Sequence, residues 1–389
     1  MYVSKLKVYN FRNLIDQTVE LHNGAIYITG RNGNGKTNLV EALYLLSGSR
    51  SFRTNSQSEL VRWGKQEASV FGTVVTKAGS SELGIALTPG HRTAFKNGTE
   101  LGSIADLMGA CSVVAFSPSD LALVKGSPAG RRKFLDRHMV DLHPPYLSVL
   151  MAYQRALDSK SALLKTPGVE EQHLAAWNKL LAESAVKIVD NRYKFLKQLL
   201  EKSRSFHHQF AQSDGQLDIR LESDLLPQDK RPGDGVVVVE SLEPEGINPG
   251  RFEQEFARVA PREIAQRSCV LGPHRDDVAI TIGGIDARAY ASQGQTRSVV
   301  LALKLGVIEL LEERLGEPPI VVLDDVDSEL DATRAEQLFL ALSRHERQLF
   351  ITGTSTPPAT LAETSSSKVQ VIELKEGVIT DRSNPGAES

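Results

Sequence analysis

The spacing of hydrophobic and polar residues divides this chain into three stretches. In the first, up to residue 127, apolar positions alternate with polar ones or form short runs, which is typical of strands. We predict strands at residues 3–9, 18–21, 69–77, 83–88, 93–96 and 112–116, and a hairpin turn at Asn97–Gly98. The strand at 18–21 should pair with 3–9, and the strands together should form one mixed sheet.

A helical period replaces this pattern after residue 127. Residues 131–139 and 251–267 are predicted to be helical, and residues 146–165 and 172–203 carry a long helical period with charges on the opposite face. A helical hairpin or small helical domain fits this stretch, which also contains strands predicted at 214–221 and 236–239. We therefore expect a mainly helical second domain at residues 128–267.

The alternation of strands and helices returns in the last stretch. Strands are predicted at residues 278–282, 320–323, 348–351 and 369–374, and helices at 296–315 and 332–343. The outer stretches together predict an α/β domain formed by residues 1–127 and 268–380, into which the helical domain is inserted. Residues 381–389 are polar and contain Pro, Gly and Ser, so we expect a disordered tail.

A glycine-rich segment lies between a buried apolar run and a helical pattern near the N-terminus. It has the form G-x-x-x-x-G-K-T, and we call it the phosphate loop: Gly30, Arg31, Asn32, Gly33, Asn34, Gly35, Lys36 and Thr37. Its glycines let the backbone aim N–H groups at phosphate oxygens, and the helix N-terminus adds positive potential. Lys36 can reach the β- and γ-phosphates, and the Thr37 hydroxyl can ligate Mg²⁺. A chance Gly/Asn turn is the alternative, but every fixed letter stands in the required strand–loop–helix setting.

Two adjacent carboxylates follow the apolar run at residues 320–323. Such a strand delivers side chains at its carboxyl end, where α/β sheets bind ligands. Asp324 would hold Mg²⁺, directly or through water, and Asp325 would orient the attacking water and help to deprotonate it. An Asp-Asp pair can also cap a turn, but the presence of the phosphate loop favours the nucleotide-site interpretation.

A second phosphate-binding segment is predicted just before the helix at 296–315. Ser292, Gly294 and Gln295 offer a hydroxyl, a glycine that permits close approach, and free backbone N–H groups. Ser-x-Gly also begins many ordinary helices, so the motif alone is weak. Its position favours function, because 324 − 292 places it 32 residues before Asp324. We call residues 292–295 the signature segment.

These motifs, followed by residues 328–331, resemble the ABC-type ATPases of DNA repair and chromosome maintenance, and within them the RecF family of recombination mediators. Further segments similar to that family occur at residues 11–13, 116–121, 130–136 and 271–277, and the resemblance spans residues 2–374. It implies an ABC-type P-loop ATPase head with mixed β-sheets, flanking helices and an inserted, mainly helical domain. An SMC-like chromosome-maintenance ATPase is the alternative, although the chain has no run long enough for an extended coiled coil.

The resemblance implies a nucleotide site shared between two subunits of an ATP-dependent homodimer. Ser292, Gly294 and Gln295 of one subunit would cover the ATP and Mg²⁺ that Lys36 and Thr37 of the other subunit hold. Residues 328–331 would cross the interface between the subunits. The implied partners are duplex and gapped DNA, RecR, and the RecO and RecA pathway proteins, with RecA loading at single-strand gaps as the purpose.

Two departures from the broader ABC pattern predict a slow, DNA-dependent ATPase that acts as a switch. Asp325 stands where a longer Glu is usual. No His occurs at residues 350–355, where the ABC pattern has one, and either Thr352 or Thr354 would sense the γ-phosphate instead.

The charge distribution limits where nucleic acid could bind. The net charge is −3, from 45 basic and 48 acidic residues, so a DNA surface must be a local patch. The compact cluster Arg131, Arg132 and Lys133 is either such a contact or an ordinary solvated face. Residues 274–277 could suggest a metal site, but no second His or Cys cluster lies nearby, so we expect a hydrogen-bonded turn beside the ATP site.

Other classes of protein fit the sequence poorly. The phosphate loop and the signature segment begin 262 residues apart (292 − 30), much further than in the ATPase subunit of a membrane transporter. No Asn-Lys-x-Asp occurs to read guanine, which argues against a GTPase. No apolar run approaches the roughly 18–20 residues of a membrane span, and the N-terminus lacks the apolar core of a signal peptide. We expect a cytoplasmic protein.

Overall fold

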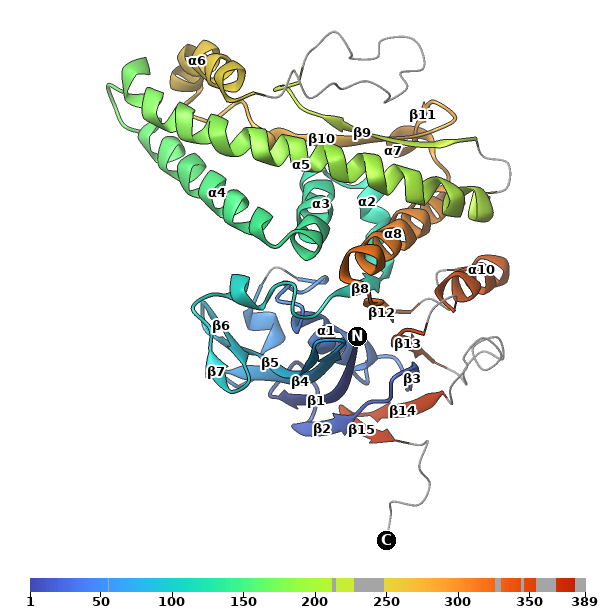
Figure 1. Cartoon of the computed structure of the whole chain (residues 1–389). Coiled ribbons are helices and arrows are strands. Elements are labelled where there is room, and N and C mark those ends of the chain that lie inside the picture. The colour runs from blue at the N-terminus through green and yellow to red at the C-terminus, as the bar shows by residue number, and fades with distance from the viewer. Residues whose placement is uncertain are drawn as a thin grey trace. The chain divides into compact units, whose positions relative to one another are not determined.

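The protein is described by a computed structural model, which covers residues 1–54, 56–211, 215–226, 248–325, 330–343, 346–354 and 369–381. The chain forms two compact units (Figure 1): unit 1 contains Met1–Asp120 and Val307–Ser389, and unit 2 contains Leu121–Gly306. The first predicted boundary, at 127, lies close to the observed one. The second, at 267, is too early, because residues 268–306 pack with unit 2.

One six-stranded sheet of unit 1 holds the phosphate loop. Its order is β15–β14–β3–β13–β12–β8, with β3 Ala25–Thr29, β8 Val113–Phe116, β12 Ile320–Leu323, β13 Leu349–Gly353, β14 Gln370–Lys375 and β15 Val378–Asp381. Neighbouring strands are parallel except for β14 and β15. β8, β12 and β13 are buried throughout, and β3 is buried up to Ile28, which explains their continuous apolar sequences. The carboxyl ends of β3, β13 and β12 therefore meet at one edge.

A second six-stranded sheet of unit 1 is antiparallel. Its order is β2–β1–β4–β5–β6–β7, with β1 Tyr2–Tyr9, β2 Gln17–Glu20, β4 Ala68–Thr76, β5 Gly79–Thr88, β6 His91–Lys96 and β7 Thr99–Glu100. The predicted pairing of residues 3–9 with 18–21 is confirmed. The expectation of one mixed sheet is wrong, because β1 and β4 bury only part of their residues and need a solvent-facing side.

Both sheets of unit 1 share a hydrophobic core with helix α1 Lys36–Leu45. Unit 1 also contains helix α10 Ala332–Leu342 and the 3₁₀ helices η1 Ser58–Leu60 and η2 Ile104–Leu107. A further 3₁₀ helix, η3 Pro118–Leu121, ends at the boundary of the two units. Asn97 and Gly98, with φ angles of 51° and 79°, form the predicted hairpin turn between β6 and β7.

Unit 2 is mainly helical. Its helices are α2 Ala122–Lys125, α3 Pro128–Leu142, α4 Pro145–Leu163, α5 Glu171–Ala211, α6 Pro249–Gln266 and α7 Ala287–Tyr290. The predicted helical hairpin is confirmed, because α5 packs against both α4 and α6 (Figure 1). α5 continues eight residues beyond the predicted end at 203, over a total of 41 residues.

A small antiparallel sheet completes unit 2, in the order β11–β10–β9. Its strands are β9 Leu217–Glu222, β10 Asp277–Ile282 and β11 Ile285–Asp286, so the strand that we assigned to the α/β domain at 278–282 belongs here. Helix α8 Gln293–Leu315 contains the unit boundary. Gly306 lets α8 approach α5, since a Cβ at that position would lie 2.5 Å from Ser203 Oγ.

Some predicted features lie outside the described residues. They are the strand at 236–239, residues 328 and 329 of the segment 328–331, and the tail after residue 381. Among the helices that the structure does describe, none is both long and apolar enough to cross a membrane.

Candidate nucleotide-binding site

The phosphate loop joins the end of β3 to the start of α1, as the motif predicts. Gly30, Gly33 and Gly35 have φ angles of 148°, 85° and 107°, values that side chains disfavour. A Cβ at Gly30 would lie 2.3 Å from the Leu374 carbonyl oxygen, and one at Gly35 would lie 2.7 Å from Asn13 Oδ1. The loop therefore needs glycine at both ends for close packing, whereas Gly33 is open to its surroundings.

The Lys36 ammonium lies within the curve of the loop. Its Nζ donates to the Gly30 carbonyl at 2.6 Å and lies 3.4 Å from the Arg31 carbonyl and 3.5 Å from Asn32 Oδ1. Burial lowers the Lys36 pKa, while the charges of Asp325 and Asp324 oppose that shift. The loop thus holds a cation among backbone groups at a helix N-terminus, where phosphate oxygens bind.

The Thr37 hydroxyl and the Asp324 carboxylate meet across the edge of the parallel sheet. Thr37 Oγ1 donates to Asp324 Oδ1 at 2.9 Å, although 287 residues separate the two in sequence. Burial raises the Asp324 pKa, and the hydroxyls of Thr37 and Thr352 counteract this by stabilising the charged form. A hydroxyl beside a carboxylate is the hard oxygen donor set that Mg²⁺ prefers, so these two residues fit the predicted metal site.

Asp325 stands directly after Asp324 in an unusual backbone conformation. Its φ is 56°, in the left-handed region, which is uncommon for a residue other than glycine. Its N–H donates to Thr352 Oγ1 at 2.8 Å. From the sequence alone, Thr352 and Thr354 are equal alternatives for sensing the γ-phosphate. The structure distinguishes them, because Thr352 is buried beside both aspartates and Thr354 is exposed.

Three asparagine side chains support the phosphate loop: Asn34 belongs to the loop itself, and Asn13 and Asn38 lie outside it. Asn13 Nδ2 donates to the Gly33 carbonyl at 2.9 Å, and Asn38 Nδ2 donates to Asn13 Oδ1 at 2.7 Å. Asn34 Nδ2 donates to the Leu374 carbonyl, also at 2.9 Å. In the sequence Asn13 belongs only to the family-like segment 11–13, and no local pattern shows that its side chain reaches the loop.

Helix α1 carries a buried carboxylate, Glu41, that the sequence motifs do not single out. Glu41 has no exposed surface, and both its oxygens accept hydrogen bonds from Arg12 at 2.7 Å. The Ser51 hydroxyl also donates to it, and Arg53 lies 3.7 Å away. A charged residue among the apolar positions of a predicted helix is the signal that could have found it. The ion pair ties the segment before β2 to the helix that follows the phosphate loop.

In unit 2, the residues of the signature segment form the N-terminal cap of helix α8. Ser292 Oγ accepts from the Gln295 N–H at 3.1 Å, and Gln295 Oε1 accepts from the Ser292 N–H at 2.8 Å. This reciprocal pair satisfies two of the backbone donors at the start of α8. Ser292 is exposed, and Gly294 lies in the first turn between the two capping residues.

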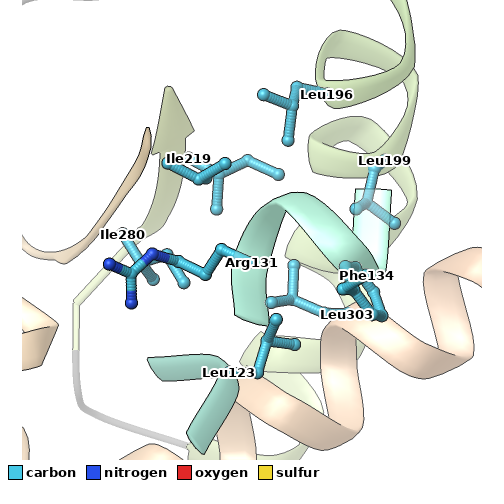
Figure 2. Close-up of a pocket in the computed structure, with 9 residues that line it drawn as sticks. Leu123, Arg131, Phe134, Leu196, Leu199, Ile219, Ile280 and Leu303 are labelled. Carbon is cyan, nitrogen blue, oxygen red and sulfur yellow. The ribbon is translucent and has the colours of Figure 1, made fainter. Parts of the chain in front are cut away.

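The basic cluster of α3 does not form one surface. Arg131 is only 2% exposed, and its guanidinium makes two parallel hydrogen bonds to Asp277, at 2.6 and 2.8 Å. Figure 2 shows its stem among Leu123, Ile219 and Ile280 at a small apolar cavity. The predicted DNA contact is therefore corrected at Arg131, which is committed to an internal ion pair.

The other two members of that cluster differ from Arg131. Arg132 is partly buried and donates to the Asp276 carbonyl at 2.6 Å, whereas Lys133 is exposed. Asp276 itself pairs with Arg192 at 2.9 Å, and His274 Nδ1 lies 2.7 Å from the Tyr153 hydroxyl. In the part of the chain that the structure describes, no group of His, Cys, Asp and Glu could hold a metal ion on its own. The predicted hydrogen-bonded turn is confirmed at residues 272–276, within unit 2, whereas its place beside the ATP site stays a prediction.

Comparison with known proteins places this geometry in a family. The family described as RecF/RecN/SMC N terminal domain matches residues 2–380. The DNA replication and repair protein RecF of Symbiobacterium thermophilum is 38% identical over 355 residues, which cover 91% of this chain and 92% of that protein.

Solved structures agree with the sequence comparison. The recombination mediator protein RecF-ATP of the RecFOR pathway matches with a TM-score of 0.86 and 30% identity, over 98% of this chain and 97% of that one. An Smc head bound to the C-winged helix domain of ScpA matches with a TM-score of 0.54 and 14% identity, over 98% of this chain and 97% of that one. The latter likeness concerns the fold alone. The fold class predicted from the sequence is confirmed.

Proposed function

Because this chain belongs to the RecF family, we propose that it is an ATP-dependent DNA-binding protein of recombinational repair and replication restart. The observation that carries the nucleotide part is the hydrogen bond from Thr37 to Asp324, at the helix that begins in the phosphate loop. The DNA part rests on the relatives, which are described as DNA replication and repair proteins and, in one solved structure, as RecF-ATP.

Each group of the site has its own task in this proposal. The backbone N–H groups of the phosphate loop bind the phosphates, and Lys36 neutralises charge on the β- and γ-phosphates. Thr37 and Asp324 would hold Mg²⁺, which when bound offsets the charge of the phosphate oxygens. Asp325 orients the attacking water and accepts its proton. Since Asp is one methylene shorter than Glu, we expect hydrolysis to be slow.

We place the signature segment of one subunit on the nucleotide of another in an ATP-dependent homodimer. In support, Ser292 is exposed at the N-terminus of a helix of 23 residues, an end that favours anions. The dimer would bind duplex or gapped DNA and release it after hydrolysis. RecR and the RecO and RecA pathway proteins are the proposed partners, and RecA loading at single-strand gaps is the proposed outcome.

Nucleotide binding by a Lys36→Ala variant tests the first half of this proposal. The change removes the cation of the loop, so we expect the dissociation constant of a fluorescent ATP analogue with Mg²⁺ to rise by about tenfold or more. Lys65→Ala, an exposed lysine of the same unit, is the matched control. Wild-type affinity in a folded Lys36→Ala protein would contradict the assignment of the phosphate loop.

Binding of duplex, gapped and single-stranded DNA, with and without ATP, tests the second half. We expect ATP to strengthen binding to duplex and gapped DNA in the wild type and to have no effect in Lys36→Ala. If the wild type binds ATP but its DNA affinity is the same with and without it, the switch mechanism is wrong and nucleotide binding alone stands.

A further inference from the structure

The hydroxyl of Thr352 joins the two carboxylate residues of the site. β12 and β13 are parallel neighbours, and Leu323 pairs with Ile351 in their register. The next residues, Asp324 and Thr352, therefore come level at the carboxyl edge of the sheet. Thr352 Oγ1 donates to Asp324 Oδ1 at 3.0 Å and accepts from the Asp325 N–H at 2.8 Å.

This hydroxyl donates its one proton and accepts one hydrogen bond, and both partners are neighbouring residues of the site. One hydroxyl has a single proton, and that proton goes to the Asp324 carboxylate. The side chain is 1% exposed, so water does not compete for these bonds. Thr352 is thus poorly placed to contact a phosphate directly, and well placed to fix what surrounds it.

The conformation of Asp325 is what the Thr352 hydroxyl fixes. A φ of 56° is sparsely populated for a residue with a side chain and persists only where surrounding contacts impose it. The bond from the Asp325 N–H to Thr352 is such a contact. This hydrogen bond sets the direction of the backbone at Asp325, and the backbone in turn sets the position from which the Asp325 side chain extends.

We propose that Thr352 is a positioning residue, which holds Asp325 in its left-handed conformation and in register with Asp324. Its effect on hydrolysis rests on the proposed function, since Asp325 is the residue that would handle the attacking water. Thr352 acts through Asp325 and does not itself contact the nucleotide. Thr354, two residues further and exposed, has no part in this arrangement.

Three variants separate positioning from packing. Thr352→Val keeps the branched shape and removes both hydrogen bonds, whereas Thr352→Ser keeps the hydroxyl and removes a methyl group. Thr354→Val is the matched control, because it makes the same chemical change at the exposed neighbour. Amide hydrogen exchange at Asp325, measured without nucleotide, reports the geometry directly, and single-turnover ATP hydrolysis reports its consequence.

The exchange experiment tests the contact itself. We expect the Asp325 amide to exchange about two- to tenfold faster in Thr352→Val than in the wild type, as the loss of one hydrogen bond predicts. Exchange should be close to wild type in Thr352→Ser and in Thr354→Val. Unchanged protection in Thr352→Val would overturn the proposal, whether or not the protein binds ATP.

The hydrolysis experiment tests whether the contact acts through Asp325. We expect a rate loss of about tenfold or more in Thr352→Val, with ATP-analogue affinity within about twofold of wild type, and recovery in Thr352→Ser. Adding Thr352→Val to Asp325→Asn should cause little further loss, because the two changes remove one function. A full additional loss in the double variant, or a failure of Thr352→Ser to recover, would contradict action through Asp325. A wild type that binds no ATP would instead refute the proposed function, and the exchange result would still decide the positioning role.

Discussion

Replacing Arg131 separates a structural role for the α3 cluster from a role in DNA binding. Arg131→Ala removes the guanidinium that makes two hydrogen bonds to Asp277 and one of 3.0 Å to the Gly126 carbonyl. What remains is a carboxylate whose partner has gone, at a site where the side chain of Asp277 is only 21% exposed. We therefore expect Arg131→Ala to lower the stability of the fold, rather than to remove a contact with DNA.

The size of this effect follows from the burial of the pair. Removing one partner of a buried ion pair costs about 3–5 kcal/mol. We take the lower end, about 3 kcal/mol of the free energy of unfolding, because the partial exposure of Asp277 lets water solvate its charge. At a denaturant sensitivity of about 3 kcal/mol per molar urea, the unfolding midpoint should fall by about 1 M.

Urea unfolding followed by circular dichroism measures this directly, and Lys133→Ala is the matched control. Lys133 lies two residues along the same helix and is exposed, so its replacement should change the free energy of unfolding by no more than about 0.5 kcal/mol. In a double-mutant cycle, the variant that carries both Arg131→Ala and Asp277→Ala should recover part of the lost unfolding free energy, because no unpaired charge then remains. An Arg131→Ala protein with the wild-type unfolding midpoint but weakened DNA binding would refute this reasoning and would support a direct contact between Arg131 and DNA.

Three further predictions concern Lys133, the glycines of the phosphate loop and His274. Lys133→Ala should lower the slope of log affinity against log salt for duplex DNA by about 0.9 if this lysine contacts a phosphate, and an unchanged slope would return it to the solvated face. Gly30→Ala should abolish binding of an ATP analogue, because its Cβ would meet the Leu374 carbonyl, whereas Gly33→Ala, in open space, should weaken binding much less. Burial lowers the pKa of His274 to about 4, so its contribution to stability is present above the unfolded value of 6.5 and is lost as the pH falls through 4. In His274→Gln the fall in unfolding free energy between pH 6.5 and 4 should be smaller by about 2–3 kcal/mol, as urea titrations at several pH values would show.

The sequence was sufficient for those parts of the site that local patterns determine. The phosphate loop is eight consecutive residues with fixed letters, and a buried parallel strand such as β12 shows itself as a continuous apolar run before Asp324. Both patterns depend on neighbours in sequence. They therefore predicted Lys36, Thr37 and Asp324, and the structure brings Thr37 and Asp324 into contact.

The parts that failed depend on partners far along the chain. Arg131 reads as part of a basic surface because the sequence does not show that Asp277, 146 residues later, covers it. Thr352 could not be separated from Thr354, because only the register of β13 with β12 decides which hydroxyl meets the aspartates. The single mixed sheet failed for the same reason, since two strands of similar composition can join different sheets.

The signature segment has a local explanation and a functional one, and substitutions at Ser292 can separate them. In the structure Ser292 caps α8, and losing such a cap costs about 1 kcal/mol. Ser292→Asp keeps a good capping oxygen but places an anion where we propose that a partner's phosphate docks, whereas Ser292→Arg removes the cap and blocks the same place. We expect both variants to bind ATP as monomers but to lose ATP-driven dimerisation and hydrolysis, with only Ser292→Arg losing stability.

Asp325→Asn completes this experiment, because it leaves the signature segment intact and removes the carboxylate that handles water. Its dimer should form with ATP and persist on DNA, since the step that opens the dimer is blocked. Sedimentation with and without ATP distinguishes these states. A Ser292→Asp protein that dimerises and hydrolyses ATP like the wild type would show that the segment only caps a helix. The shared-site mechanism would then be wrong, even if Lys36→Ala behaves as predicted.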